Sequence, residues 1–189
     1  KVVGLARRID KIEALSKTLT EESGKLYAIK CDITREDDVI KYFTWIVNNI
    51  GPIHVLINNA YLMKPANLTS KTNLNAMRQN CTYKCYIISD GSSEDWRRVF
   101  EVNVIALSTC TREAVKIMNE HGIAGHIVHM NSVHGHFVPG GNDNNLNVYP
   151  ASKFAVTALA ESLRQELRVA KSKIKITSIS PGFIRMDLD

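Results

Sequence analysis

Short apolar runs alternate with longer stretches of helical spacing along most of this chain. The runs cover 1–6, 26–31, 53–58, 125–131 and 173–180, and their length and content are typical of strands. Between them, apolar residues recur three or four positions apart, as Ile12, Leu15 and Leu19 do, which predicts amphipathic helices. The run at 53–58 is almost continuously apolar, so we expect that strand to be buried on both faces.

Capping residues place the beginnings of the longer helices. Thr34 with Asp37 predicts a capping box for a helix over 35–49, and Ser92 with Asp95 predicts the cap of a helix that ends near 120. A further helix is expected from Tyr149 to 170. Residues 62–91 interrupt the alternation and carry no convincing period.

Strands that alternate with helices indicate right-handed crossovers and a parallel sheet. We therefore predict an α/β fold, a Rossmann-like doubly wound parallel sheet with helices on both faces, over residues 1–189 as one domain. In such sheets, ligands bind beyond the carboxyl ends of the strands. The polar and turn-forming residues at or just after those ends are Arg7, Arg8, Asp32, Asn58, Asn59, Ser132, Pro181 and Gly182.

Composition and charge narrow the class of protein. The 189 residues are 44% hydrophobic and 23% charged, as in an ordinary globular domain. The net charge is +5, and the basic residues are scattered along the chain without aromatic residues between them. This pattern argues against a nucleic-acid-binding protein. Four cysteines form no disulfide framework, which favours a reducing compartment such as the cytoplasm. No apolar run is long enough to predict a membrane span.

The histidines do not form a recognisable metal site. His126 and His129 are three apart on a predicted strand, so they point to opposite faces. His134 and His136 lie in a loop without a nearby cysteine or carboxylate. We therefore predict no metal.

The chemistry of the chain is carried by Tyr149 and Lys153. They lie four residues apart at the start of a helix, so their side chains share one helical face. A neighbouring ammonium favours the phenolate, so we expect Lys153 to lower the pKa of Tyr149 toward the working range. Ser132 ends the preceding strand and adds a hydroxyl. Together these groups predict a site that moves a proton at a carbonyl or alcohol oxygen.

These residues resemble the motifs of the short-chain dehydrogenase/reductase superfamily, in the order in which that family has them. The matching positions are Asp32, Asn58-Asn59-Ala60, Asn103, Ser132, Tyr149-x-x-x-Lys153 and Pro181-Gly182. Within the superfamily, the stretches 4–8, 28–33 and 147–149 resemble the insect farnesol-dehydrogenase-like branch.

The resemblance implies a role for each catalytic position. Tyr149 would be the general acid that protonates the carbonyl oxygen in reduction and the base in the reverse direction. Lys153 would lower its pKa and hold the ribose of the nicotinamide nucleotide. Ser132 would bond the substrate oxygen, and Asn103 would keep a water in line with Lys153. The implied substrate is a lipophilic primary or secondary alcohol, or its aldehyde or ketone.

The resemblance also implies where the cofactor lies and that the protein is a homo-oligomer, either a dimer or a tetramer. Asp32 and Ile33 would flank the adenine, and Asn59 with Ala60 would lie beside the cofactor. Pro181 and Gly182 would approach the nicotinamide.

The choice between cofactors can be argued from charge. Arg7 and Arg8 follow the first strand with no acid beside them to repel a 2′-phosphate, and arginine binds phosphate through paired, charge-assisted hydrogen bonds. We therefore expect NADP(H) rather than NAD(H).

The sequence departs from the family pattern in several places. No Gly-x-x-x-Gly-x-Gly turn occurs, so the chain is expected to lack the first βα unit, and the C-terminal segment of the family is not matched either. Tyr61 stands where the family has a glycine, and Met186 where a threonine is usual. Residues 70–89 read as an irregular insertion. A catalytically silent relative, acting only as a binding or oligomerisation module, therefore stays open as the alternative.

Overall fold

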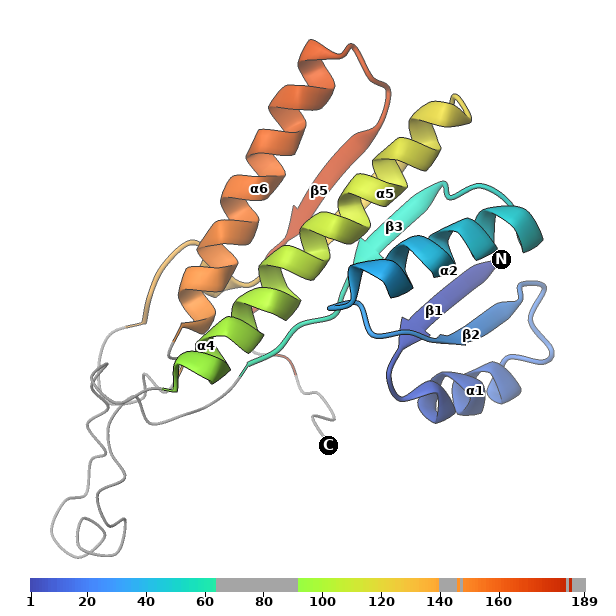
Figure 1. Cartoon of the computed structure of the whole chain (residues 1–189), viewed down its shortest axis with the longest axis horizontal. Helices are drawn as coiled ribbons and strands as arrows, with labels where there is room; N and C mark the ends of the chain where they lie inside the picture. The colour runs from blue at the N-terminus through green and yellow to red at the C-terminus, as the bar shows by residue number, and fades with distance from the viewer. Residues whose placement is uncertain (64–91, 140–145, 147, 183, 185–189) are drawn as a thin grey trace, which may run out of the picture.

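The computed structural model describes residues 1–63, 92–139, 146, 148–182 and 184 (Figure 1). Within these residues strands and helices alternate as predicted. The elements are β1 (Val2–Ala6), α1 (Ile9–Thr18), β2 (Leu26–Lys30), α2 (Glu36–Asn49), β3 (Val55–Asn58), α4 (Ser93–Phe100), the π-helical turn η2 (Glu101–Ala106), α5 (Leu107–Glu120), β4 (His126–Met130), the 3-10 turn η3 (Val133–Gly135), α6 (Tyr149–Val169) and β5 (Lys175–Ile179). The predicted insertion at 70–89 lies outside the described residues.

The strands pair in parallel but in two separate ladders. β1 pairs with β2, and β4 lies between β3 and β5. Among the described strands, no ladder joins β1 to β3. The strand arrows of both ladders run toward the same side of the molecule (Figure 1). The predicted parallel α/β architecture is therefore confirmed, with its sheet divided between β1 and β3.

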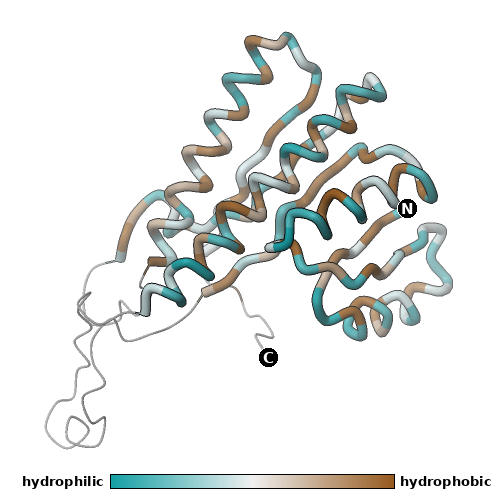
Figure 2. The backbone as a smooth tube through the Cα atoms, in the orientation of Figure 1, coloured by the Kyte–Doolittle hydropathy of each residue, from teal (hydrophilic) through white to brown (hydrophobic). Residues whose placement is uncertain are grey.

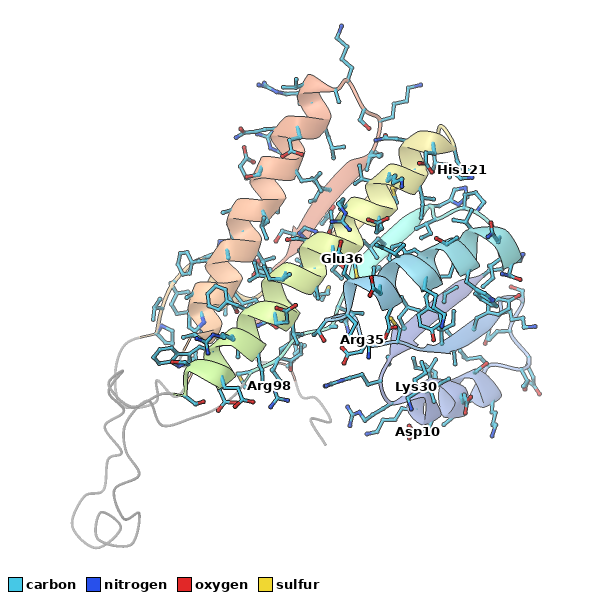
Figure 3. The ribbon with its side chains drawn as sticks, in the orientation of Figure 1. Asp10, Lys30, Arg35, Glu36, Arg98 and His121 are labelled. Atoms are coloured by element: carbon cyan, nitrogen blue, oxygen red, sulfur yellow. The ribbon has the colours of Figure 1, made fainter. Side chains whose placement is uncertain are left out.

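The hydrophobic core lies between the strands and the helices α2, α5 and α6. Its buried residues are Val39, Phe43, Cys110, Ala114, Ile117, Met118, Ile127, Leu167 and Ile174. Hydrophobic positions recur along the helices and follow one another in the strands, as expected for strands that face a covering layer (Figure 2). Glu36, at the start of α2, accepts a 2.8 Å hydrogen bond from Arg112 of α5 (Figure 3). No helix in the described ranges combines the length and apolar character that crossing a bilayer requires.

The prediction that the strand at 53–58 is buried on both faces is wrong. Val55 and Ile57 are 56% and 59% exposed, whereas Leu56 packs against the core. Successive side chains of a strand point to opposite faces. Of the described helices, α5 packs on β3 and covers one of these faces. The apolar residues of the other face therefore remain accessible.

One predicted helix cap is confirmed and the other is wrong. The Ser92 hydroxyl accepts a 3.4 Å hydrogen bond from the Asp95 N–H at the start of α4. At α2, Thr34 does not cap the helix. Its N–H and hydroxyl instead donate to Asp32 Oδ1, at 3.1 and 2.8 Å. Asp32 is only two residues away, and such short-range side-chain turns compete with caps.

The long helix predicted from residue 92 to 120 is present, with one feature that spacing did not predict. Between α4 and α5 the chain takes the wider π-helical turn η2. Such turns insert one extra residue per turn and re-aim the side chains that follow. Asn103 and Ala106 of this turn are buried, and α6 packs against it. The turn thus faces a polar amide into the interior beside the start of α6.

Candidate active site

Ser132, Tyr149 and Lys153 converge at the carboxyl end of β4, as the sequence predicts. Ser132 follows β4, and the other two occupy the first turns of α6, which packs against η3. All three are buried, with exposures of 8%, 8% and 3%. A hydrogen bond joins the side chains of Ser132 and Tyr149. Two hydroxyls and an ammonium thus share one small, largely dehydrated space.

Lys153 is held at the back of this space. Its Nζ donates a 2.8 Å hydrogen bond to the carbonyl oxygen of Met130, the last residue of β4. Nζ also lies 5.7 Å from the centroid of the Tyr149 ring. Burial disfavours the charged form and lowers the pKa of Lys153 from 10.5 to about 8. Lys153 therefore loses its proton at a pH only slightly above neutral.

The expectation that Lys153 lowers the pKa of Tyr149 is not met. Burial raises the pKa of Tyr149, the hydrogen bond with Ser132 lowers it, and the nearby Tyr61 raises it, and the net result is a higher value. The Lys153 ammonium lies over the tyrosine ring and bonds to the Met130 carbonyl. Desolvation therefore dominates, and the phenol of Tyr149 holds its proton at neutral pH.

Asn103 fastens the segments around the site to one another. Its Oδ1 accepts the Leu62 N–H at 2.7 Å, and its Nδ2 donates to the Leu62 carbonyl and to the Ser152 hydroxyl, both at 2.9 Å. Asn103 is 1% exposed, so these bonds form out of contact with water. The amide joins the chain after β3 to the residue directly before Lys153. Its implied role in a water relay stays a prediction.

Two aromatic neighbours of Tyr149 were not predicted as site residues. The Tyr61 ring meets the Tyr149 ring edge-on, with centroids 6.3 Å apart. The His134 ring meets it similarly at 6.4 Å, and the His134 N–H donates to the Ser132 hydroxyl at 3.2 Å. Ser152 was also missed. Its position directly before Lys153, on a helix turn that must pack inward, is the signal that could have found it.

Gly135 allows η3 to approach α6 closely. A methyl group on its Cα would lie 2.7 Å from Asn131 Oδ1 and 2.8 Å from the Lys153 carbonyl oxygen. The Thr157 hydroxyl donates to the Gly135 carbonyl at 3.0 Å and accepts from Asn131 Nδ2 at 2.8 Å. The site is therefore closed on this side by direct contact between backbones.

The predicted adenine end lies at the carboxyl ends of β1 and β2. Arg7 and Arg8 are exposed, and Arg8 is the residue from which α1 begins. Burial raises the pKa of Asp32, but hydrogen bonds from Thr34 and the charges of Arg7 and Arg35 hold it below its usual range. Arg35 and Lys30 gather at this end of the molecule (Figure 3). This end of the molecule therefore carries several cationic side chains, with the carboxylates of Asp32, Asp38 and Asp10 among them (Figure 3).

The remaining predicted cofactor residues lie at the carboxyl ends of the strands but differ in exposure. Asn59 and Ala60 are exposed after β3, and Gly182 is exposed after β5. The Pro181 carbonyl accepts the Val133 N–H at 3.0 Å, next to Ser132. The Ile33 side chain packs against the hydrophobic core. It therefore has a structural role in addition to its predicted place beside the adenine. Met186 lies outside the described residues.

A second buried polar network lies beneath the site. The Asn58 amide donates to the Thr111 hydroxyl at 2.9 Å, and that hydroxyl lies 3.2 Å from His129 Nε2. His129 is 1% exposed, and burial together with the charge of Lys153 lowers its pKa from 6.5 to about 4. It is therefore neutral at physiological pH. In the described residues, no group of three or more potential ligands could hold a metal ion.

Comparison with known proteins identifies the family. The family model described as short chain dehydrogenase matches residues 1–189. Farnesol dehydrogenase of Aedes aegypti is 39% identical over 188 residues, covering 99% of this chain and 68% of that protein. Dehydrogenase/reductase SDR family member 11 of Gallus gallus is 41% identical over 187 residues, covering 97% and 65%. The chain thus spans about two thirds of the length of these relatives.

Solved structures agree on the fold. A short chain dehydrogenase/reductase from Burkholderia phymatum, solved in complex with NAD, superimposes with a TM-score of 0.79 at 24% identity. The match covers 97% of this chain and 57% of that one.

The chain belongs to the short-chain dehydrogenase family. That family consists of oxidoreductases that use NAD or NADP.

The buried His129 predicts a loss of stability in acid. The histidine of the unfolded chain takes up a proton near pH 6.5, whereas the folded protein resists protonation until about pH 4. Unfolding therefore takes up a proton in this window, and stability should fall by up to about 3 kcal/mol as the pH drops through it. Urea unfolding at a series of pH values measures this dependence.

The matched controls for this prediction are two histidine variants. His129→Gln should flatten the dependence between pH 6.5 and 4 because the titrating group is gone. His126→Gln removes a histidine that is more exposed and should leave the slope unchanged. An equal slope in wild type and His129→Gln would contradict the assignment.

Proposed function

We propose that residues 1–189 form one dinucleotide-binding domain of an NADP(H)-dependent oxidoreductase. It would interconvert a lipophilic primary or secondary alcohol and its aldehyde or ketone. The observation that carries this proposal is the buried convergence of Ser132, Tyr149 and Lys153 beyond the carboxyl end of β4. This set provides a hydroxyl donor, a protonated phenol and a cation where a reacting oxygen would lie.

The raised pKa of Tyr149 suits the reductive direction. A phenol that holds its proton at neutral pH is ready to donate it to a carbonyl oxygen as that oxygen gains negative charge. The Ser132 hydroxyl would bond the same oxygen and fix its position. Lys153, whose Nζ lies 5.7 Å from the centroid of the Tyr149 ring, would hold the ribose of the bound nucleotide beside this phenol. The bound nicotinamide nucleotide supplies or accepts the hydride.

Candidate residues for the two ends of a nicotinamide nucleotide support this proposal. At the adenine end, exposed Arg7 and Arg8 stand where α1 begins, and the free N–H groups of a helix N-terminus also favour a phosphate. This supports NADP(H), although the solved relative named above was bound to NAD. At the other end Lys153 and Pro181 flank Ser132. None of the described residues forms a glycine-rich turn for the pyrophosphate.

Apolar side chains beside the catalytic residues support a lipophilic substrate. Phe137 and Val138 are 52% and 57% exposed directly after η3. The Phe137 ring lies 5.4 Å from that of His134, which in turn contacts Tyr149. An apolar substrate could therefore cover these residues while its oxygen reaches Tyr149. The name of the Aedes aegypti relative, a farnesol dehydrogenase, points the same way.

A groove of about 370 Å³ between α5 and α6 supports a homo-oligomer. Leu107, Leu163, Lys116 and Glu166 are among the residues that line it. A second copy related by a two-fold axis could place the Lys116 of one chain near the Glu166 of the other.

Cys31 and Cys110 are buried free thiols, which supports a reducing location such as the cytoplasm.

The catalytically silent alternative also has structural support. β1 and β3 share no ladder, and Tyr61 stands where the family pattern has a glycine. A folded chain that neither binds a nicotinamide nucleotide nor converts any alcohol or carbonyl compound would favour this alternative.

Tyr149→Phe should abolish turnover because it removes the proton donor but keeps the ring. We expect the rate to fall about 100-fold or more, with the affinity for the nucleotide unchanged within a few-fold. The measurement is NADPH oxidation with a panel of lipophilic aldehydes and ketones. Tyr42→Phe, on α2, is the matched control and should retain full activity. Turnover by Tyr149→Phe at a rate close to that of the wild type would refute the assigned role.

Arg8→Asp should weaken NADPH much more than NADH, because only NADPH carries the 2′-phosphate. The expected loss of NADPH affinity is about ten- to a hundredfold, measured by equilibrium titration with both nucleotides. Arg168→Asp makes the same charge change in the last turn of α6 and should affect both nucleotides little. Equal losses for NADPH and NADH in the Arg8 variant would overturn the preference.

A further inference from the structure

Lys153 is a buried charge without an acidic partner. Its side chain is 3% exposed, and in the part of the chain that the structure describes no carboxylate lies within salt-bridge distance. A buried ammonium is costly unless other groups stabilise it. The Met130 carbonyl accepts one hydrogen bond from Nζ, at 2.8 Å. A single hydrogen bond to a carbonyl offsets only part of the cost of burying this charge. Other groups must therefore offset the rest.

Two aromatic rings also lie close to the ammonium. Nζ lies 5.5 Å from the centroid of the Tyr61 ring and 5.7 Å from that of Tyr149. Both distances fall within about 6 Å, the range in which a ring face attracts a cation. The rings meet edge-on at an angle of 60°. Together they form a corner around Nζ, which we call the aromatic cradle (Tyr61 and Tyr149).

We propose that Tyr61 is a positioning residue of this site, whose ring keeps Lys153 in its ammonium form and holds it beside Tyr149. The proposal rests on the function proposed above, in that it takes Lys153 as part of the active site. Tyr61 reaches the site from the segment after β3, and the Leu62 backbone next to it is fixed by Asn103. The backbone next to Tyr61 is therefore anchored by a buried amide.

The other titratable groups that face Lys153 do not stabilise its charge. His129, from β4, is neutral above about pH 4, in part because the charge of Lys153 disfavours its protonation. Tyr149, from α6, holds its proton, since its pKa is raised. The faces of the two rings and the Met130 carbonyl, by contrast, favour the charged form of Lys153.

This role of Tyr61 has a consequence near neutral pH. The pKa of Lys153 is about 8, so a modest further decrease would leave much of the side chain uncharged in the working range. The proposed reaction would then lose the cation that the site places where the reacting oxygen would lie. A tyrosine where the family resemblance has a glycine would thus serve the catalytic lysine directly in this chain.

The test is an NMR titration of Lys153 in the nucleotide-free chain, with its signal assigned from the Lys153→Met variant. Tyr61→Leu keeps an apolar side chain but removes the ring. It should lower the midpoint of the Lys153 titration by about one pH unit. It should also shift the Cε protons of Lys153 downfield, because a ring current is lost. Tyr61→Phe keeps the ring and should titrate like the wild type.

A remote aromatic variant and a stability measurement separate positioning from folding. Tyr42→Leu removes a ring from α2 and should leave the Lys153 titration unchanged, and urea unfolding checks that each variant is folded. A Tyr61→Leu chain that is folded and titrates like the wild type would overturn the proposal. So would a Tyr61→Phe chain that shifts as far as Tyr61→Leu, since the hydroxyl would then be responsible. The titration needs neither nucleotide nor turnover, so it can fail or succeed independently of the proposed function.

Discussion

The side-chain amide of Asn103 is the interaction on which the geometry of the site depends. It bonds both backbone groups of Leu62 and the hydroxyl of Ser152, in the interior of the protein. These bonds link the chain after β3, the π-helical turn and the start of α6. Because buried amide bonds are costly to leave unmade, the three segments are held in one arrangement. That arrangement brings Tyr61, which precedes Leu62, and Lys153, which follows Ser152, to the same point.

Burial then determines the chemistry of the groups that meet there. Removal from water raises the pKa of Tyr149 and lowers those of Lys153 and His129, so each group favours its neutral form. In the proposed reduction this suits Tyr149, since an acid must carry its proton. For Lys153 it is a cost, which the aromatic cradle and the Met130 carbonyl offset. The site thus combines a phenol, Tyr149, that holds its proton strongly with an ammonium, Lys153, whose pKa is close to neutral pH.

Much of this arrangement follows from local sequence patterns, and the rest follows from contacts that no pattern records. Apolar periodicity predicts the alternating elements, and the four-residue spacing predicts that Tyr149 and Lys153 share a face. Spacing does not report burial, which is why the direction of the Tyr149 pKa was predicted wrongly. It also does not reveal that Thr34 bonds to Asp32 instead of capping α2, or that one face of β3 is accessible. These outcomes depend on competing partners and on neighbouring layers.

The central proposal is that Ser132, Tyr149 and Lys153 lie beside a site for a phosphorylated nicotinamide nucleotide. The most direct test is a fluorescence titration of the purified chain with NADPH and, in parallel, with NADH. The account predicts saturable binding of both nucleotides, with NADPH bound more tightly, because Arg7 and Arg8 are exposed where α1 begins. No saturable binding of either nucleotide by a folded sample would contradict it.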